Sequence, residues 1–70
     1  MFVVLHFQGG PRDGSALRVS DKTLASNEFV ERRFPAKRST NEYLYQSQAP
    51  WDGAEKDKIL HYLGVVQMKE

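Results

Sequence analysis

The first hydrophobic segment of this chain, residues 2–7, is short and rich in β-branched and aromatic side chains. Six residues are too few for a stable helix, so length and composition favour a strand. Side chains alternate between the two faces of a strand. Both faces are mainly apolar here, with Val3, Leu5 and Phe7 on one and Phe2, Val4 and His6 on the other. We therefore expect this strand to be covered on both sides inside a sheet, or to line a small barrel.

Three further segments, residues 15–20, 28–34 and 42–48, alternate between two sets of side chains and predict strands. Pro35 ends the second of these segments, because proline cannot donate a hydrogen bond to a strand ladder. The alternation groups Leu17 with Val19, Val30 with Arg32 and Phe34, and Tyr43 with Tyr45 and Ser47.

The last segment admits two interpretations. Asp52 and Glu55 have the spacing of a capping box, which predicts a helix over residues 53–63. The alternative is a strand over residues 58–68, in which Gly64 marks a β-bulge. We favour the strand because the segment is rich in β-branched and aromatic residues.

Together these segments predict an all-β domain: an antiparallel meander of four to five strands that forms a bent sheet or an open SH3-like barrel. The alternative is an α+β fold with the helix at 53–63. A short helical turn over residues 23–27, capped by Asp21 or Ser26, is the one further element. Seventy residues make a single small domain, 1–70.

A glycine-rich turn, residues 9–14, separates the first two predicted strands; its turn-forming residues are Gly9, Gly10, Pro11, Asp13 and Gly14. A phosphate-binding loop would need a Lys-Ser/Thr pair and a helix after its last glycine. Here a predicted strand follows instead, so we interpret the stretch as a structural turn that joins a hairpin.

This opening strand and its Gly-Gly-Pro-x-Asp-Gly turn resemble those of a class of short bacterial and phage proteins, and residues 61–65 match the aromatic-glycine ending of that class more loosely. The class is uncharacterised. The resemblance therefore implies an N-terminal hairpin, a C-terminal strand and an origin in mobile elements, and it transfers no catalytic or binding residue.

Composition narrows the classes of function. The chain has no cysteine, which excludes disulfides and cysteine-ligated zinc, and two histidines are too few for a His-only metal site. We expect no metal and no cofactor. A domain of this size has a net stability of only about 3–5 kcal/mol, so a protein partner or a homo-oligomer is expected.

Charge and hydropathy bear on partners and location. The net charge is +1, so no overall field favours nucleic acid or a membrane. The first apolar run lacks a basic flank and is too short for a signal peptide or a membrane span. With no cysteine as well, we expect a cytoplasmic protein.

The candidate interaction surface combines basic and aromatic residues from the middle of the chain: Arg32, Arg33, Lys37, Arg38, Tyr43, Tyr45 and Trp51. Trp51 lies in a predicted turn, where it is either exposed to a partner or folded back over the open end of the sheet. Small barrels also bind single strands through positive grooves and stacking aromatics. We therefore expect a non-enzymatic binding or accessory domain, acting by protein interaction or self-association; the alternative is weak nucleic-acid binding through residues 32–38.

Catalysis is not expected, because a chain this short rarely builds the concave, partly dry site that acid–base chemistry needs. The one other chemical candidate is a pairing of His6 with His61, which would require the first and last strands to be neighbours.

Overall fold

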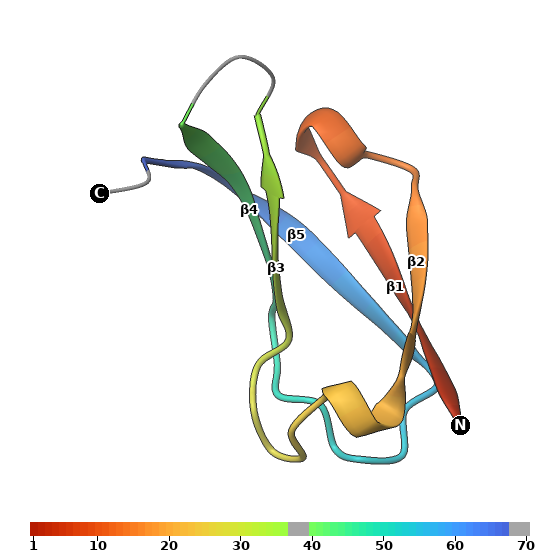
Figure 1. Ribbon diagram of the computed structural model, residues 1–70. Coiled ribbons are helices and arrows are strands. Elements are labelled where there is room, and N and C mark those ends of the chain that lie inside the picture. The colour runs from red at the N-terminus through yellow and green to blue at the C-terminus, as the bar shows by residue number, and fades with distance from the viewer. Residues whose placement is uncertain (37–39, 68–70) are drawn as a thin grey trace.

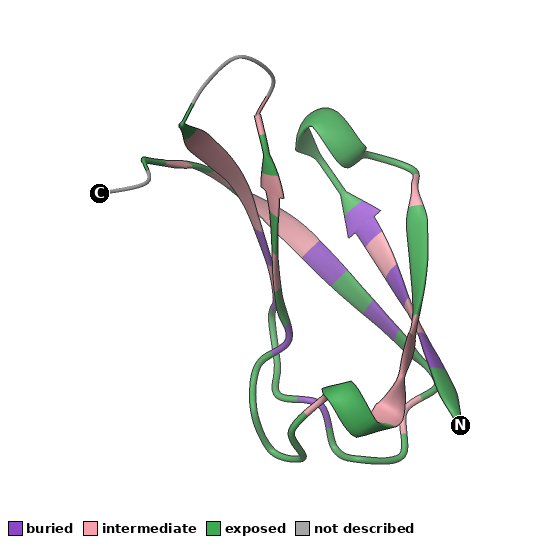
Figure 2. Ribbon diagram, in the orientation of Figure 1, coloured by how far each residue is buried: buried purple, intermediate pink, exposed green. Residues whose placement is uncertain are grey.

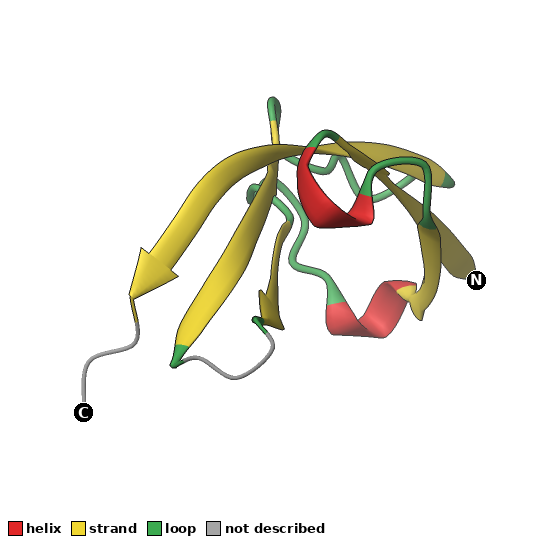
Figure 3. Cartoon of the chain, turned by 90° about the horizontal axis from the view of Figure 1, so that it is seen from above, coloured by secondary structure: helices red, strands yellow, loops and turns green. Residues whose placement is uncertain are grey.

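The computed structural model describes residues 1–36 and 40–67, which form one five-stranded sheet with two short 3-10 helices and no α-helix (Figure 1). The sheet curls into a half-barrel (Figure 3). The predicted all-β domain with a bent sheet is therefore confirmed. The elements are β1 (Phe2–Gln8), η1 (Gly10–Arg12), β2 (Ala16–Ser20), η2 (Asp21–Thr23), β3 (Glu31–Pro35), β4 (Asn41–Ser47) and β5 (Asp57–Gln67).

The strand order is β2-β1-β5-β4-β3, so β2 and β3 are the two edges of the sheet. β1 and β2 form the predicted antiparallel hairpin, and β4 pairs antiparallel with both β3 and β5. One pairing departs from a simple antiparallel meander: β5 lies beside β1 and runs parallel to it, with Ile59 opposite His6. β5 is the last strand in sequence but lies in the middle of the sheet, between β1 and β4. It enters the sheet beside the start of β1, where Asp57 pairs with Val4, and therefore runs in the same direction as β1.

The helix considered for residues 53–63 is absent, because β5 begins at Asp57. Lys58 and Leu60 are buried whereas Ile59 between them is exposed, which is the period of a strand. The predicted bulge is present, since Leu44 pairs with Gly64 and Tyr45 pairs with Tyr62. Gly64 has a φ of 122°, which other residues rarely adopt. The end of the predicted strand, Met68, lies outside the described residues.

Two local predictions need correction. The helical turn expected at residues 23–27 lies at Asp21–Thr23 instead, and Ser20 caps it by accepting a hydrogen bond from the Lys22 N–H at 3.2 Å. The strand expected to begin at Glu28 begins at Glu31. The Val30 N–H donates to the Ser47 hydroxyl, at 2.9 Å, so a side chain takes part where β3 joins the sheet.

The hydrophobic core lies on the concave side of the curl. Figure 2 shows its buried residues as purple bands that alternate along β1 and β5. Of the two alternatives expected for β1, coverage on both sides is wrong, because Phe2 on the opposite face is 60% exposed. The strand instead lines the half-barrel with Val3, Leu5 and Phe7. A single curled sheet has only one interior, so the second apolar face of β1 stays at the surface. The buried hydrophobic residues are Val3, Leu5, Phe7, Val30, Tyr45, Trp51 and Leu60.

The glycine-rich turn is held by two tyrosines from other strands. Tyr45 is fully buried; its hydroxyl donates to the Gly9 carbonyl at 2.6 Å and accepts from the Arg12 N–H at 2.8 Å. Gly10 has a φ of 64°, and a Cβ atom there would lie 2.5 Å from the Tyr62 ring. Glycine is therefore required at position 10 for its backbone conformation and for space.

Removal of the Tyr45 hydroxyl should destabilise the fold without disturbing the aromatic packing. We expect Tyr45→Phe to lose about 1–3 kcal/mol in urea unfolding, because the Gly9 carbonyl and the Arg12 N–H both lose a part-buried partner. Tyr43→Phe is the matched control, since the Tyr43 hydroxyl makes no hydrogen bond within the described residues. Equal losses in the two variants would show that the turn is not held in this way.

Candidate interaction surface

The convex side of the sheet carries an exposed apolar strip. Phe2 is 60% exposed and Ile59 is 46% exposed, while Val4 beside them is half-buried. These side chains point outward because they alternate with the buried residues of β1 and β5. We call this surface the outer face and define it by Phe2, Val4 and His6 of β1, Asp57 and Ile59 of β5, and Arg18 of β2.

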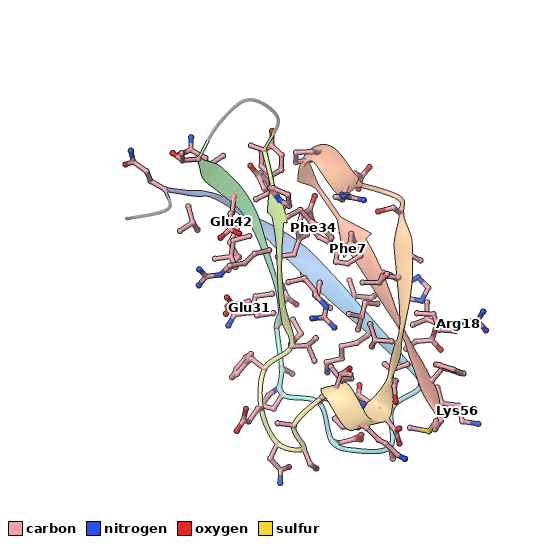
Figure 4. The ribbon with its side chains drawn as sticks, in the orientation of Figure 1. Phe7, Arg18, Glu31, Phe34, Glu42 and Lys56 are labelled. Atoms are coloured by element: carbon pink, nitrogen blue, oxygen red, sulfur yellow. The ribbon has the colours of Figure 1, made fainter. Side chains whose placement is uncertain are left out.

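Opposite charges flank the apolar strip. In the strand register, Val4 stands between Arg18 on β2 and Asp57 on β5. The Arg18 guanidinium lies over the Phe2 ring, 5.2 Å from its centre, and the His6 Nε2 atom is 2.9 Å from Asp57 Oδ1. Figure 4 shows Arg18 pointing away from the core, on the side of the molecule opposite Glu31 and Glu42. The outer face therefore has a basic flank and an acidic flank.

A hollow of about 310 Å³ adjoins the acidic flank, where the loop after β4 meets β5. It has polar and charged walls as well as the apolar side chain of Ile59. Its lining residues are Gln48, Ala49, Glu55, Asp57, Lys58, Ile59 and His61.

The loop before β5 is tied together by Asp52, Glu55 and Lys58. The buried Lys58 ammonium donates to the Pro50 carbonyl and to the Glu55 carboxylate, at 3.2 and 3.0 Å. Asp52 Oδ1 accepts from the Ala54 and Glu55 N–H groups, at 2.8 and 2.9 Å. The capping-box contacts expected of Asp52 and Glu55 thus form without a helix, and the N–H bonds from Ala54 and Glu55 lower the pKa of the Asp52 carboxyl.

Two of the three aromatic residues of the predicted interaction surface are buried, and the third, Tyr43, is half-buried. Tyr45 is fully buried and Trp51 is only 4% exposed, so the exposed position expected for Trp51 is wrong. The Trp51 indole donates to the Glu55 carbonyl at 2.9 Å, and its ring belongs to the hydrophobic core, as in the alternative of a residue folded back over the sheet. Tyr43 packs against the core and contacts the Tyr62 ring edge-on, with ring centres 6.3 Å apart.

The basic part of the predicted surface is divided between two faces. Arg32 lies on the concave side, in register with Tyr45. Arg33 is exposed on the opposite face and forms ion pairs with Glu31 at 2.8 Å and Glu42 at 3.9 Å. The hydrogen bond and charge of Glu31 raise the pKa of Arg33 further. Lys37 and Arg38 lie outside the described residues. The five predicted residues that are described do not form one surface, because Tyr45 and Trp51 are buried and Arg32 and Arg33 lie on opposite faces of β3.

The first and last strands are neighbours, as the His6–His61 hypothesis requires, but the register does not pair the two histidines. His6 stands opposite Ile59, and His61 stands opposite Gln8. The hydrogen-bond partner of His6 is Asp57. Within residues 1–36 and 40–67, no group of three or more metal-ligating side chains comes together, and no helix is long and apolar enough to cross a membrane.

The outer face is the feature that prediction from the candidate residues missed. Its signal was present in residues 2–7, which are apolar on both faces, but only the structure shows that one of these faces stays uncovered. Comparisons with protein-family models, with curated proteins and with solved structures found no match.

The Asp52 turn should make stability depend on pH in the acid range. Because the folded-state pKa of Asp52 lies below its unfolded value, its hydrogen bonds contribute full stability above the unfolded pKa, and this contribution is lost as pH falls through the folded pKa. Asp52→Asn keeps an oxygen acceptor without the charge. In urea unfolding, we expect wild type to exceed Asp52→Asn in stability at neutral pH, and we expect this difference to shrink as pH falls below the unfolded pKa and through the folded pKa of Asp52. A difference that stays constant with pH would contradict this role.

Proposed function

We propose that this chain is a non-enzymatic association domain that pairs with a second copy of itself through the outer face. The observation that carries the proposal is the uncovered apolar side of β1, where Phe2 is 60% exposed beside Val4 and Ile59. A strand that is apolar on both faces is typical of a sheet covered on both sides. The monomer covers one side, and a partner would cover the other.

The charges on the outer face favour a second copy as that partner. A two-fold axis that lies between the two sheets, parallel to β1 and over Val4, exchanges the β2 side with the β5 side, so Arg18 of each copy faces Asp57 of the other. The same surface is then complementary to itself, and the contact is made twice. Lys56, adjacent to Asp57 in sequence, adds a positive charge that would repel Arg18 of the other copy. Salt at physiological ionic strength screens this repulsion.

The size of the chain is consistent with such an interface. A standard interface covers about 800 Å² on each partner, which is about a sixth of the 5001 Å² of accessible surface of this chain. Sheets that pack face to face bury their apolar side chains between them, as this strip would require. Pairing would also give a small domain a second hydrophobic layer.

Nucleic-acid binding through residues 32–38 has less support. Arg33 is already paired with Glu31 and Glu42, and Arg32 lies on the other face of β3. A stacking role for Tyr45 or Trp51 would require core side chains to leave the interior.

Substitution in the centre of the apolar strip should abolish pairing. We expect Ile59→Arg to remain monomeric in sedimentation equilibrium at concentrations where the wild type dimerises, because a buried unpaired guanidinium opposes contact. Phe29→Arg is the matched control, since Phe29 is similarly exposed but precedes β3, away from the outer face. A wild type that stays monomeric up to millimolar concentration would overturn the proposal.

The charge arrangement can be tested separately. Arg18→Asp and Asp57→Arg should each weaken dimerisation by about tenfold or more, because each places like charges together. The double variant restores opposite charges and should recover most of the affinity. Sedimentation of the four proteins distinguishes this pairing from a general effect of net charge, because the double variant has the wild-type net charge. No recovery would place the two residues away from each other in the dimer.

A further inference from the structure

Arg32 carries a buried hydrogen-bond donor that has no acceptor among the described residues. This donor is the Nε atom of the side chain. Arg33 beside it has two carboxylate partners, whereas none of the ion pairs in the described chain involves Arg32. A buried N–H group without an acceptor destabilises the fold, so an acceptor supplied from outside would be favoured.

A pocket of about 240 Å³ opens beside Arg32, between the segment after η2 and the beginning of β3. Leu24 and Val30 form part of its apolar wall and belong to or pack against the core, while Phe29 at its edge is 51% exposed. The pocket is therefore suited to one apolar side chain next to one that is acidic. Its lining residues are Thr23, Leu24, Ala25, Glu28, Phe29, Val30, Glu31 and Arg32.

The pocket lies at a free edge of the sheet, because no strand follows β3 in the strand order. The Ser47 N–H donates to the Val30 carbonyl, and the Ala36 N–H donates to the Asn41 carbonyl. In an antiparallel ladder, alternate residues direct their backbone groups toward the partner strand. Glu31 and Arg33 consequently direct their backbone N–H and C=O groups away from β4, where another strand can pair with them.

The concave face of β3 continues the positive charge beyond Arg32. Phe34 lies two residues further along the same face, and the Arg12 guanidinium is 4.3 Å from the centre of its ring. No carboxylate in the described chain forms an ion pair with Arg12. Side chains on one face of a strand are about 7 Å apart. A strand added beside β3 would therefore pass first the pocket, then the Arg32 guanidinium and then the Arg12 guanidinium over Phe34.

We propose that the edge of β3 binds an extended acidic segment of a partner protein as an additional strand. An acidic side chain of that segment accepts hydrogen bonds from Arg32, and an apolar side chain two residues away occupies the pocket over Leu24 and Val30. The backbone groups of Glu31 and Arg33 supply the ladder, which is the usual source of affinity in strand addition. This site is separate from the outer face, so it does not depend on the dimer.

The acidic residues around the pocket set the selectivity rather than prevent binding. The Glu31 carboxylate is engaged by Arg33 at 2.8 Å. Glu28 is exposed and lines the pocket, so its charge opposes an acidic ligand. Charged side chains on an edge strand also protect it against indiscriminate pairing, and an acidic ligand that matches Arg32 overcomes that protection.

The test uses the full chain and a synthetic peptide, acetyl-Thr-Val-Thr-Glu-Thr-Val-Thr-amide, with its glutamine analogue as the matched control. Backbone amide shifts in ¹H–¹⁵N spectra report where each peptide binds. We expect the acidic peptide to shift the amides of Glu31 and Arg33 and to bind about tenfold or more tightly than the glutamine peptide. Equal affinity for the two peptides, or shifts confined to β2, would overturn the proposal.

Two sets of variants test the role of Arg32. Arg32→Gln should remove the preference for the acidic peptide, whereas Arg33→Gln, on the opposite face, should retain it. Glu28→Gln should strengthen binding of the acidic peptide, because it removes an opposing charge. A preference that survives in Arg32→Gln would contradict the assignment.

A modified peptide tests strand addition without altering the protein. N-methylation of the residues whose N–H groups face β3 should abolish binding, and N-methylation of the alternate residues should leave it unchanged. Loss in both cases would contradict the proposed ladder. If a single-stranded oligonucleotide displaces the peptide and binds more tightly, the site belongs to nucleic acid instead.

Discussion

The fold depends on the position of Tyr45 more than on any other side chain. Its ring lies edge-on to Phe7 and Phe34, with ring centres 5.1 and 5.8 Å away, and its hydroxyl holds the backbone of the glycine-rich turn. These contacts connect β4 with β1, with β3 and with the turn before β2, which are distant in sequence. Without a disulfide or a metal-binding cluster in the described chain, a sheet this small keeps its curl through such contacts.

The same curl explains why the molecule has two unsatisfied surfaces. Curling directs one face of each strand into a shared interior, and the buried side chains of β1, β5 and β4 fill it. No described segment then packs over the convex face of β1, where Phe2 is exposed and Val4 half-buried, although both are as apolar as the buried residues beside them. Because the curl stops short of a closed barrel, β2 and β3 also remain as edges. The exposed apolar surface on β1 and the sheet edges at β2 and β3 thus both result from the incomplete curl of the sheet.

The period of hydrophobic residues was enough to predict the strands, but it could not predict which apolar face would be covered. Alternation places Tyr43 and Tyr45 on one face in either case, and an interface and a core prefer the same aromatic residues. Trp51 lies in a segment with turn-forming neighbours, so only the tertiary contact with Glu28 and Glu55 shows that it is buried. Nor does any residue in β5 encode its direction beside β1, because both orientations present the same alternate side chains inward. The Gly64 bulge could be predicted, since the need for a positive φ is local.

Arg32 and Arg33 are neighbours in sequence, but their side chains lie in different environments on the two faces of β3. The two residues have the same side chain and adjacent positions, yet the pleat places one against the core and the other in solvent among carboxylates. The exposed guanidinium of Arg33 is paired with two carboxylates, whereas the Nε donor of Arg32 is buried and has no acceptor among the residues that the structure describes. A solvent-exposed arginine can find water or a carboxylate by rotation, but a half-buried one must accept the partners that its pocket admits. The unpaired donor of Arg32 therefore supports the proposal of an acidic ligand more directly than the basic composition of residues 32–38 does.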